Sequence, residues 1–188
     1  MVKAEKGDRI LVVNILTDSF QDNKSVNYVI KQDTNRLKRL KKLMQYSYDY
    51  CELFGEVLMS DDKNACALVI FPDKKKTTLK SVLLDIGLAW SCVGLSNLKK
   101  VLKRESKIRS QHGNAIMYYL WFIGVDSKSQ NRGIGSSLLN ELIHRSDQLH
   151  RPIYLETSTL KNLPWYEKFG FCIYHELDFG YKLFCLKR

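Results

Sequence analysis

The sequence predicts a single α/β domain, and three observations lead to this class. Apolar residues with helical spacing alternate along the chain with short β-rich runs. The run Tyr118–Val125 is apolar on both faces, which is what a strand buried between two layers requires. The 188 residues, 45 % of them hydrophobic, are enough to build one core without staples.

The first part of the chain is predicted to form two helices and a hairpin. Asp8 is a candidate N-cap for the first helix and Asn35 for the second. The β-rich runs Glu56–Met59 and Ala65–Phe71 flank a polar loop, and Pro72 stops the second strand. Three apolar residues share one face of each predicted helix: Val13, Leu16 and Phe20 on the first, and Leu37, Leu40 and Met44 on the second.

A helical pair is predicted to interrupt the strand order at about residues 75–113. Its apolar residues recur at helical spacing: Leu79, Val82, Leu83, Ile86 and Trp90, then Leu95, Leu98 and Leu102. Leucines also recur among the charges of Arg36–Lys42 and Lys99–Arg104. We interpret both basic clusters as the solvated faces of amphipathic helices.

A glycine-containing turn, Gln130–Gly135, follows the strand Tyr118–Val125 and precedes a helix. Glycines at 133 and 135 let an anion approach the backbone, where free N–H groups and the positive end of the helix dipole converge. No glycine here is followed by Lys and then Ser or Thr, which excludes a Walker loop. Leu138 replaces the third glycine of a dinucleotide fingerprint. A tight strand-to-helix turn without a ligand is the structural alternative.

These residues resemble a known family. Gln130-x-x-Gly133-x-Gly135 after a hydrophobic strand is similar to the acetyl-CoA signature of the GNAT N-acetyltransferase superfamily. Pro152–Thr157 resembles the fifth strand of that family, and Asn162–Phe171 resembles its segment with Asn, Tyr and Gly-Phe. The resemblance is strong from about Asn114 to Arg188 and weaker from Asp8 to Pro72. The segment between Lys75 and Gly113 departs from the family core.

The resemblance implies a strongly twisted, mixed and mostly antiparallel sheet with helices on both faces, within one N-acetyltransferase domain over residues 1–188. It also implies that acetyl-CoA binds where two parallel strands splay apart. No metal is expected, because the cysteines and histidines show no metal-ligand spacing. A final hairpin, Phe171–Leu177 with Tyr181–Leu186, is expected to complete the sheet. The implied acetyl-CoA contacts are Ile123, Gly124, Val125, Gln130, Asn131, Arg132, Gly133, Ile134, Gly135, Ser136, Asn162 and Tyr166.

The implied reaction is direct acetyl transfer to a primary amine of a small-molecule or protein acceptor. Tyr166 is the candidate general acid, with a satisfied core tyrosine as the alternative. For the general base we prefer Glu156, because a carboxylate beside a central strand needs a reason to be there, with Asp126 or a water relay as alternatives. The residues expected to shape the acceptor pocket are Phe20, Tyr46, Tyr50 and the insertion.

The net charge of +10 points to an anionic partner, such as nucleic acid, an acidic membrane or a polyphosphorylated small molecule. No nucleic-acid-binding motif supports the first, and a catalytically silent acyl-CoA sensor is a further alternative.

Five widely spaced cysteines fit reduced core thiols. Met1–Arg9 lacks a signal-peptide pattern, and Ser81–Leu95 falls short of the ~18 residues of a membrane span. We expect a cytoplasmic protein without a membrane partner; monomer or homodimer stays open.

Overall fold

One seven-stranded sheet organises the part of the chain that the computed structural model describes, residues 1–113 and 115–188. Asn114, where the strong resemblance begins, lies outside this part. The strand order is β1-β2-β3-β4-β5-β7-β6. All neighbouring strands are antiparallel except β4 and β5, which confirms the mixed, mostly antiparallel sheet. The strands are β1 (Val2–Lys3), β2 (Gly55–Met59), β3 (Ala65–Ile70), β4 (Tyr118–Val125), β5 (Ile153–Thr157), β6 (Cys172–Asp178) and β7 (Lys182–Lys187).

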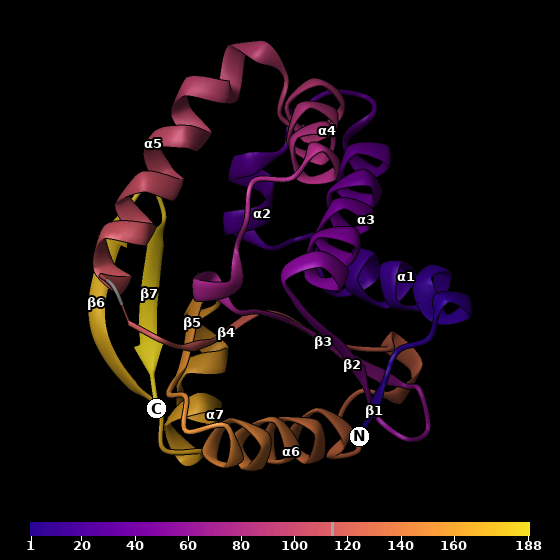
Figure 1. The fold of residues 1–188 in the computed structure, drawn as a ribbon, viewed down its shortest axis with the longest axis vertical. Helices are drawn as coiled ribbons and strands as arrows, with labels where there is room; N and C mark the ends of the chain where they lie inside the picture. Colours follow the sequence, from indigo (N-terminus) through magenta and orange to yellow (C-terminus); the bar gives the residue numbers. More distant parts are fainter. Residues whose placement is uncertain (114) are drawn as a thin grey trace.

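Helices cover both faces of this sheet, as expected. Figure 1 shows α6 and α7 on one side, while α1, α2 and α3 lie on the other. The helices are α1 (Arg9–Phe20), α2 (Lys24–Val29), α3 (Arg36–Phe54), α4 (Leu79–Leu88), α5 (Leu95–His112), α6 (Ile134–Gln148) and α7 (Leu163–Lys168). A π-helical turn, Ala89–Val93, follows α4, and short 3-10 turns occupy Lys6–Asp8, Pro72–Lys74, Ser127–Ser129 and Leu160–Asn162.

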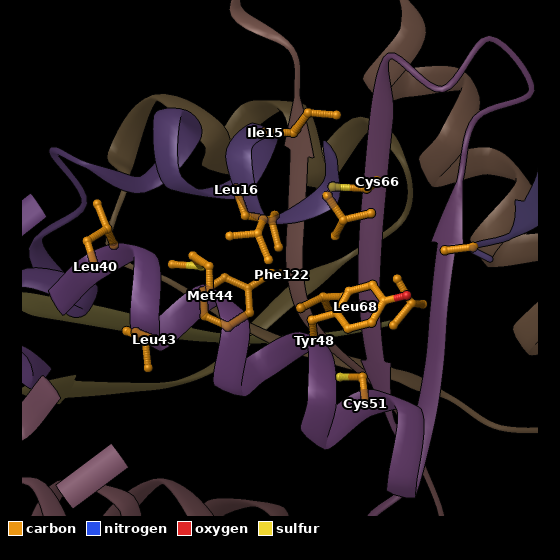
Figure 2. Close-up of a cluster of buried hydrophobic side chains, with 14 of the residues drawn as sticks. Ile15, Leu16, Leu40, Leu43, Met44, Tyr48, Cys51, Cys66, Leu68 and Phe122 are labelled. Carbon is orange, nitrogen blue, oxygen red and sulfur yellow. The ribbon is translucent and has the colours of Figure 1, made fainter. Parts of the chain in front are cut away.

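Two hydrophobic cores hold the layers together, one on each face of the sheet. In the first, shown in Figure 2, Leu16 of α1 and Met44 of α3 pack against Leu68 and Phe122 of the sheet. In the second, the apolar side of α6 packs against β4 and β5 through Leu138, Leu139, Leu142 and Ile143. All six residues of β3 are buried, because β3 lies between both layers. Full burial of each large side chain contributes roughly 1.5–3 kcal/mol.

Several N-terminal details differ from the sequence-based expectation. Helix α1 begins directly after Asp8, but the Asp8 carboxylate accepts hydrogen bonds from Glu5 N (3.0 Å) and Lys63 Nζ (2.7 Å) instead of capping α1. Asn35 precedes α3 and likewise makes no side-chain cap among the described contacts. Two short elements, β1 and α2, were not predicted, because two and six residues are too few to establish a period.

The inserted helical pair is present, but its apolar stripe does not face the core. Leu79, Leu83, Ile86 and Trp90 are 60–79 % exposed. Helix α4 packs on α3 with its other side, from which Leu88 reaches the first core. Within the described ranges, no single helix is long and apolar enough to cross a membrane; Leu79–Val93 and Leu95–His112 meet that test only together, and they are bent by 117°.

The basic cluster Lys99–Arg104 is also less solvated than expected. Lys99, Lys100 and Lys103 are not buried, but Arg104 is only 8 % exposed. Its guanidinium pairs with Glu105, donates to the Tyr181 hydroxyl at 3.0 Å and donates to Ser25 Oγ. Arg104 therefore joins α5 to α2 and to the turn between β6 and β7.

Candidate functional site

Strands β4 and β5 diverge soon after they meet, which opens the sheet at its centre. Their described pairing consists of Tyr118 with Ile153 and Tyr119 with Tyr154, both at the narrow end. Beyond this point the β5-facing side of β4 has no strand partner in the described sheet. A register shift against β3 leaves Trp121 as an extra residue in β4, and such a bulge bends a strand locally.

A cleft of about 570 Å³ occupies this opening. Glu156 and every predicted acetyl-CoA contact except Arg132 line it; Arg132 lies on the exposed surface of the same loop. The lining residues that were predicted are Ile123, Gly124, Val125, Gln130, Asn131, Gly133, Ile134, Gly135, Ser136, Glu156, Asn162 and Tyr166. Segments from four parts of the chain thus converge on one cavity.

The loop between β4 and α6 presents backbone N–H groups to the cleft. Gly133 has φ +79° and occupies the N-cap position of α6, a left-handed conformation that favours glycine. No side chain caps α6 in the described part of the chain, so its first N–H groups remain available. At Gly135, a Cβ atom would lie 3.1 Å from Val125 Cγ2, so a side chain there would crowd the strand. This geometry suits a phosphate.

Helix α7 closes the cleft from the side of the second core. The Trp165 indole donates a hydrogen bond to Ser136 Oγ at 3.0 Å, which ties α7 to the first turn of α6. Tyr166 is buried between Trp165 and Phe171, and its ring also lines the cleft. Burial raises the pKa of Tyr166 above its ordinary value. Its hydroxyl therefore keeps its proton at neutral pH and is able to donate that proton.

Glu156 is held by two neighbours, neither of which was assigned a role from the sequence. His112, at the end of α5, places Nε2 2.7 Å from Glu156 Oε1, and the Tyr119 hydroxyl donates to Oε2. The Glu156 side chain is buried. The pKa of Tyr119 is raised well above its usual value, by burial and by the Glu156 carboxylate, so Tyr119 remains a donor. No spacing in the sequence links residues 112, 119 and 156; only the fold brings them together.

Asp126, the alternative base, has a different role in the structure. Its carboxylate accepts a hydrogen bond from Lys128 N at 2.8 Å and so caps the 3-10 turn that follows β4. The turn-capping interpretation of Asp126 accounts for this contact.

A second cavity of about 460 Å³ lies on the other side of Glu156, His112 and Tyr119 from the cleft. His112 and Tyr119 line it, whereas Glu156 lines the cleft, so the three side chains stand between the two spaces. The residues expected to shape an acceptor pocket do not line one common cavity. Phe20 lines the cleft, Tyr50 lines the second cavity, and the Tyr46 hydroxyl donates to Asp85 at 2.7 Å.

Further cleft residues were missed from the sequence. Lys161 lines the cleft on the turn before α7, where its charge is available to an anion. Asn23, in the turn between α1 and α2, lines it as well. Asn23 Oδ1 accepts from Val26 N (3.0 Å), and Asn23 Nδ2 lies 3.5 Å from Thr159 Oγ1. The Asn23-Lys24 start of α2 is a readable N-cap signal; Lys161 carries none.

Comparisons with known proteins agree with this geometry. Residues 99–173 match the acetyltransferase (GNAT) domain family, a range that contains the loop, the diverging strands and α7. An uncharacterized N-acetyltransferase of Schizosaccharomyces pombe is 29 % identical over 180 aligned residues, which cover 83 % of this chain and 67 % of that protein.

Solved structures share the fold at low sequence identity. A histone acetyltransferase HPA2 and related acetyltransferase from Corynebacterium glutamicum has a TM-score of 0.70 and 19 % identity, covering 99 % of this chain and 93 % of that one. The C-terminal condensation domain of Ebony in complex with β-alanyl-dopamine has a TM-score of 0.69 and 10 % identity, covering 100 % and 96 %. Both likenesses cover nearly the whole of this chain and therefore concern the fold as a whole.

Proposed function

Because this chain is an N-acetyltransferase of the GNAT family, we propose that it transfers the acetyl group of acetyl-CoA directly to a primary amine. The GNAT family uses acyl-CoA; the acetyl donor, the amine and the residue roles are our proposals. The observation that carries them is the cleft between β4 and β5, which gathers an anion-binding loop, a buried carboxylate and a buried phenol.

The residues of the cleft fit a long ligand with a pyrophosphate at one end. Gly133, Gly135 and the uncapped start of α6 would hold the pyrophosphate, with Lys161 and Arg132 as cationic neighbours. The unpaired edge of β4, Ile123–Val125, offers backbone groups to the amide groups of a pantetheine arm. When bound, acetyl-CoA supplies an acetyl group activated as a thioester.

Glu156 is the proposed general base. An alkylammonium acceptor has a pKa near ~10 and must lose a proton before its nitrogen becomes nucleophilic. The Glu156 carboxylate lines the cleft and takes this proton at a carboxylate oxygen. Tyr119 and His112 act as positioning residues, because each holds one oxygen of the carboxylate.

Tyr166 is the proposed general acid, and β4 is the proposed source of oxyanion stabilisation. Tyr166 enters the reaction protonated and delivers its proton, or a strong hydrogen bond, to the departing sulfur. Its raised pKa makes full proton transfer less favourable than for a free phenol. A fixed N–H of β4 facing the carbonyl oxygen commonly contributes ~3 kcal/mol to such a reaction.

The cleft favours an acceptor that is neutral overall, monoamine or acidic. Phe20 and Trp121 give it aromatic walls, and Glu156 is its one carboxylate among the described lining residues. A polycation would meet few anionic partners there and would be repelled by the net charge of +10. The Ebony domain, bound to β-alanyl-dopamine, makes arylalkylamines a sensible group within the acceptor panel.

The test combines binding and turnover. Calorimetry should show that acetyl-CoA binds, and free-thiol release should then identify acceptors in a panel of neutral, anionic, arylalkyl and polycationic amines. A strong preference for polycations would contradict the acceptor class. Binding without turnover across the panel would favour the alternative of a silent acyl-CoA sensor. Tighter binding and faster turnover with a longer acyl-CoA would overturn acetyl-CoA as the donor.

A further inference from the structure

Helix α4 exposes an apolar stripe that no other described element covers. Leu79, Leu83, Ile86 and Trp90 recur at i, i+4, i+7 and i+11, which places them on one side of a helix, and each is at least 60 % exposed. The opposite side of α4 is fixed to α3. A contiguous apolar surface of this kind usually marks an interaction site.

The stretch of sequence that contains α4 holds most of the excess positive charge of the protein. Residues 74–103 contain seven lysines against the single acid Asp85, a net charge of +6 within a chain of +10. Asp85 is exposed and accepts a hydrogen bond from the Tyr46 hydroxyl at 2.7 Å, and its negative charge is already counted in this sum. Lys74 and Lys76 precede α4, Lys80 lies in its first turn, and all three are exposed.

Charge and shape together select the occupant. In a second copy of this chain, a segment of +6 would oppose another of +6, which disfavours a symmetric contact. A peptide that docks on helices needs a groove, and neither the cleft nor the second cavity is lined by a residue of α4. A convex helical ridge with Leu, Ile and Trp beside lysines matches the boundary of an anionic lipid layer.

We propose that α4 is a surface for peripheral binding to anionic membranes. The apolar stripe enters the boundary between headgroups and acyl chains, and Lys74, Lys76 and Lys80 contact the anionic headgroups. This proposal departs from the expectation of no membrane partner, which rested on the lack of a spanning segment. It is independent of the acetyl donor and acceptor proposed above.

The experiment is co-sedimentation of the purified protein with vesicles of phosphatidylcholine, with and without phosphatidylserine. Binding should require phosphatidylserine and weaken as salt is added. Leu83→Ser combined with Ile86→Ser should reduce the vesicle affinity by about tenfold or more, because two large apolar side chains are removed from the contact. The emission of Trp90 should shift to the blue on binding, and Trp90→Phe should abolish that shift.

Ile10→Ser is the matched control, because Ile10 on α1 is 70 % exposed but lies outside the stripe. Both variants should keep the circular dichroism and melting temperature of the parent protein, since the changed side chains are exposed. Equal loss of vesicle binding in the control would overturn the assignment to α4. Failure of the parent protein to bind phosphatidylserine vesicles would overturn the proposal, as would a dimer in sedimentation velocity that the double variant dissociates.

Discussion

At the scale of single residues, Tyr166 lends itself to the cleanest test of an acid role. Tyr166→Phe removes one oxygen from a buried ring and preserves its packing against Phe171. We expect turnover to fall by roughly 10²-fold or more, the usual scale for a lost general acid, while acetyl-CoA affinity stays unchanged. Steady-state kinetics and calorimetry measure the two effects. Unchanged turnover would make Tyr166 a structural tyrosine.

Burial of Tyr166 also determines how the effect of this substitution depends on pH. Because burial raises the pKa of Tyr166, its hydroxyl ionises only above the ordinary value near ~10. The rate ratio between the parent and Tyr166→Phe should therefore stay constant as the pH rises toward ~10. A ratio that collapses between neutral pH and ~9 would mean that the phenol ionises in that range.

Glu156→Gln tests the base by replacing the carboxylate with an amide of the same shape. Turnover on an alkylamine should fall by roughly 10²–10⁴-fold, the range reported for positioned acids and bases. An aromatic amine, which is already unprotonated at neutral pH, should lose much less. Equal losses on both acceptors would point to a structural role. His112→Gln, which removes a partner of Glu156 but leaves the carboxylate, should give a smaller loss.

The position of Glu156 could be predicted from the sequence, whereas that of its partner His112 could not. Alternation along a strand over 153–157 puts Glu156 and Tyr154 on the face opposite Ile153 and Leu155, and the burial pattern of β5 agrees. His112 carried no such signal. Its position depends on the end of α5 meeting β4 and β5, which is a property of tertiary packing that local spacing does not encode.

At the scale of elements, the turn into α6 can be tested for phosphate binding apart from its backbone conformation. Gly133→Glu and Gly135→Asp each place a negative side chain where the pyrophosphate is expected, so both should abolish acetyl-CoA binding. Gly180→Ala is the matched control: Gly180 also has a positive φ of +81°, but it lies in the turn between β6 and β7. It should show a comparable loss of stability with normal affinity in calorimetry. Wild-type affinity in both loop variants would refute the phosphate assignment.

Elements were easier to predict than their orientation. Periodicity identified α1, α3, α4, α5 and α6, because a repeat near 3.6 survives over ten or more residues. The same repeat does not state which neighbour an apolar stripe will meet. Leu79 and Leu83 thus lie outside the core although their spacing is that of a core-facing helix. The prediction that Asp8 caps α1 failed for a related reason, because Lys63, from a loop distant in sequence, donates a hydrogen bond to its carboxylate.

At the scale of the whole molecule, the net charge of +10 should speed the capture of a polyanion such as coenzyme A. Affinity for acetyl-CoA should fall as salt is added, because charges are screened over a Debye length of ~8 Å at physiological ionic strength. Lys99, Lys100 and Lys103, which lie outside the cleft lining, should contribute little when changed together to Gln. Arg104 is left out of this set because it is buried. A large loss of affinity in the triple variant would place the phosphates near α5.

The short contact between β4 and β5 also determines how the molecule exchanges its amide hydrogens. Only two residue pairs join these strands in the described sheet, so the amides on the open edge of β4 lack the protection that a paired strand enjoys. In the free protein, the unpaired amides within 120–125 should exchange deuterium faster than those of fully buried β3. A ligand that bridges the opening should slow them to the level of β3. Mass spectrometry of peptides from β4, with and without acetyl-CoA, would therefore map the bound arm without any need for turnover.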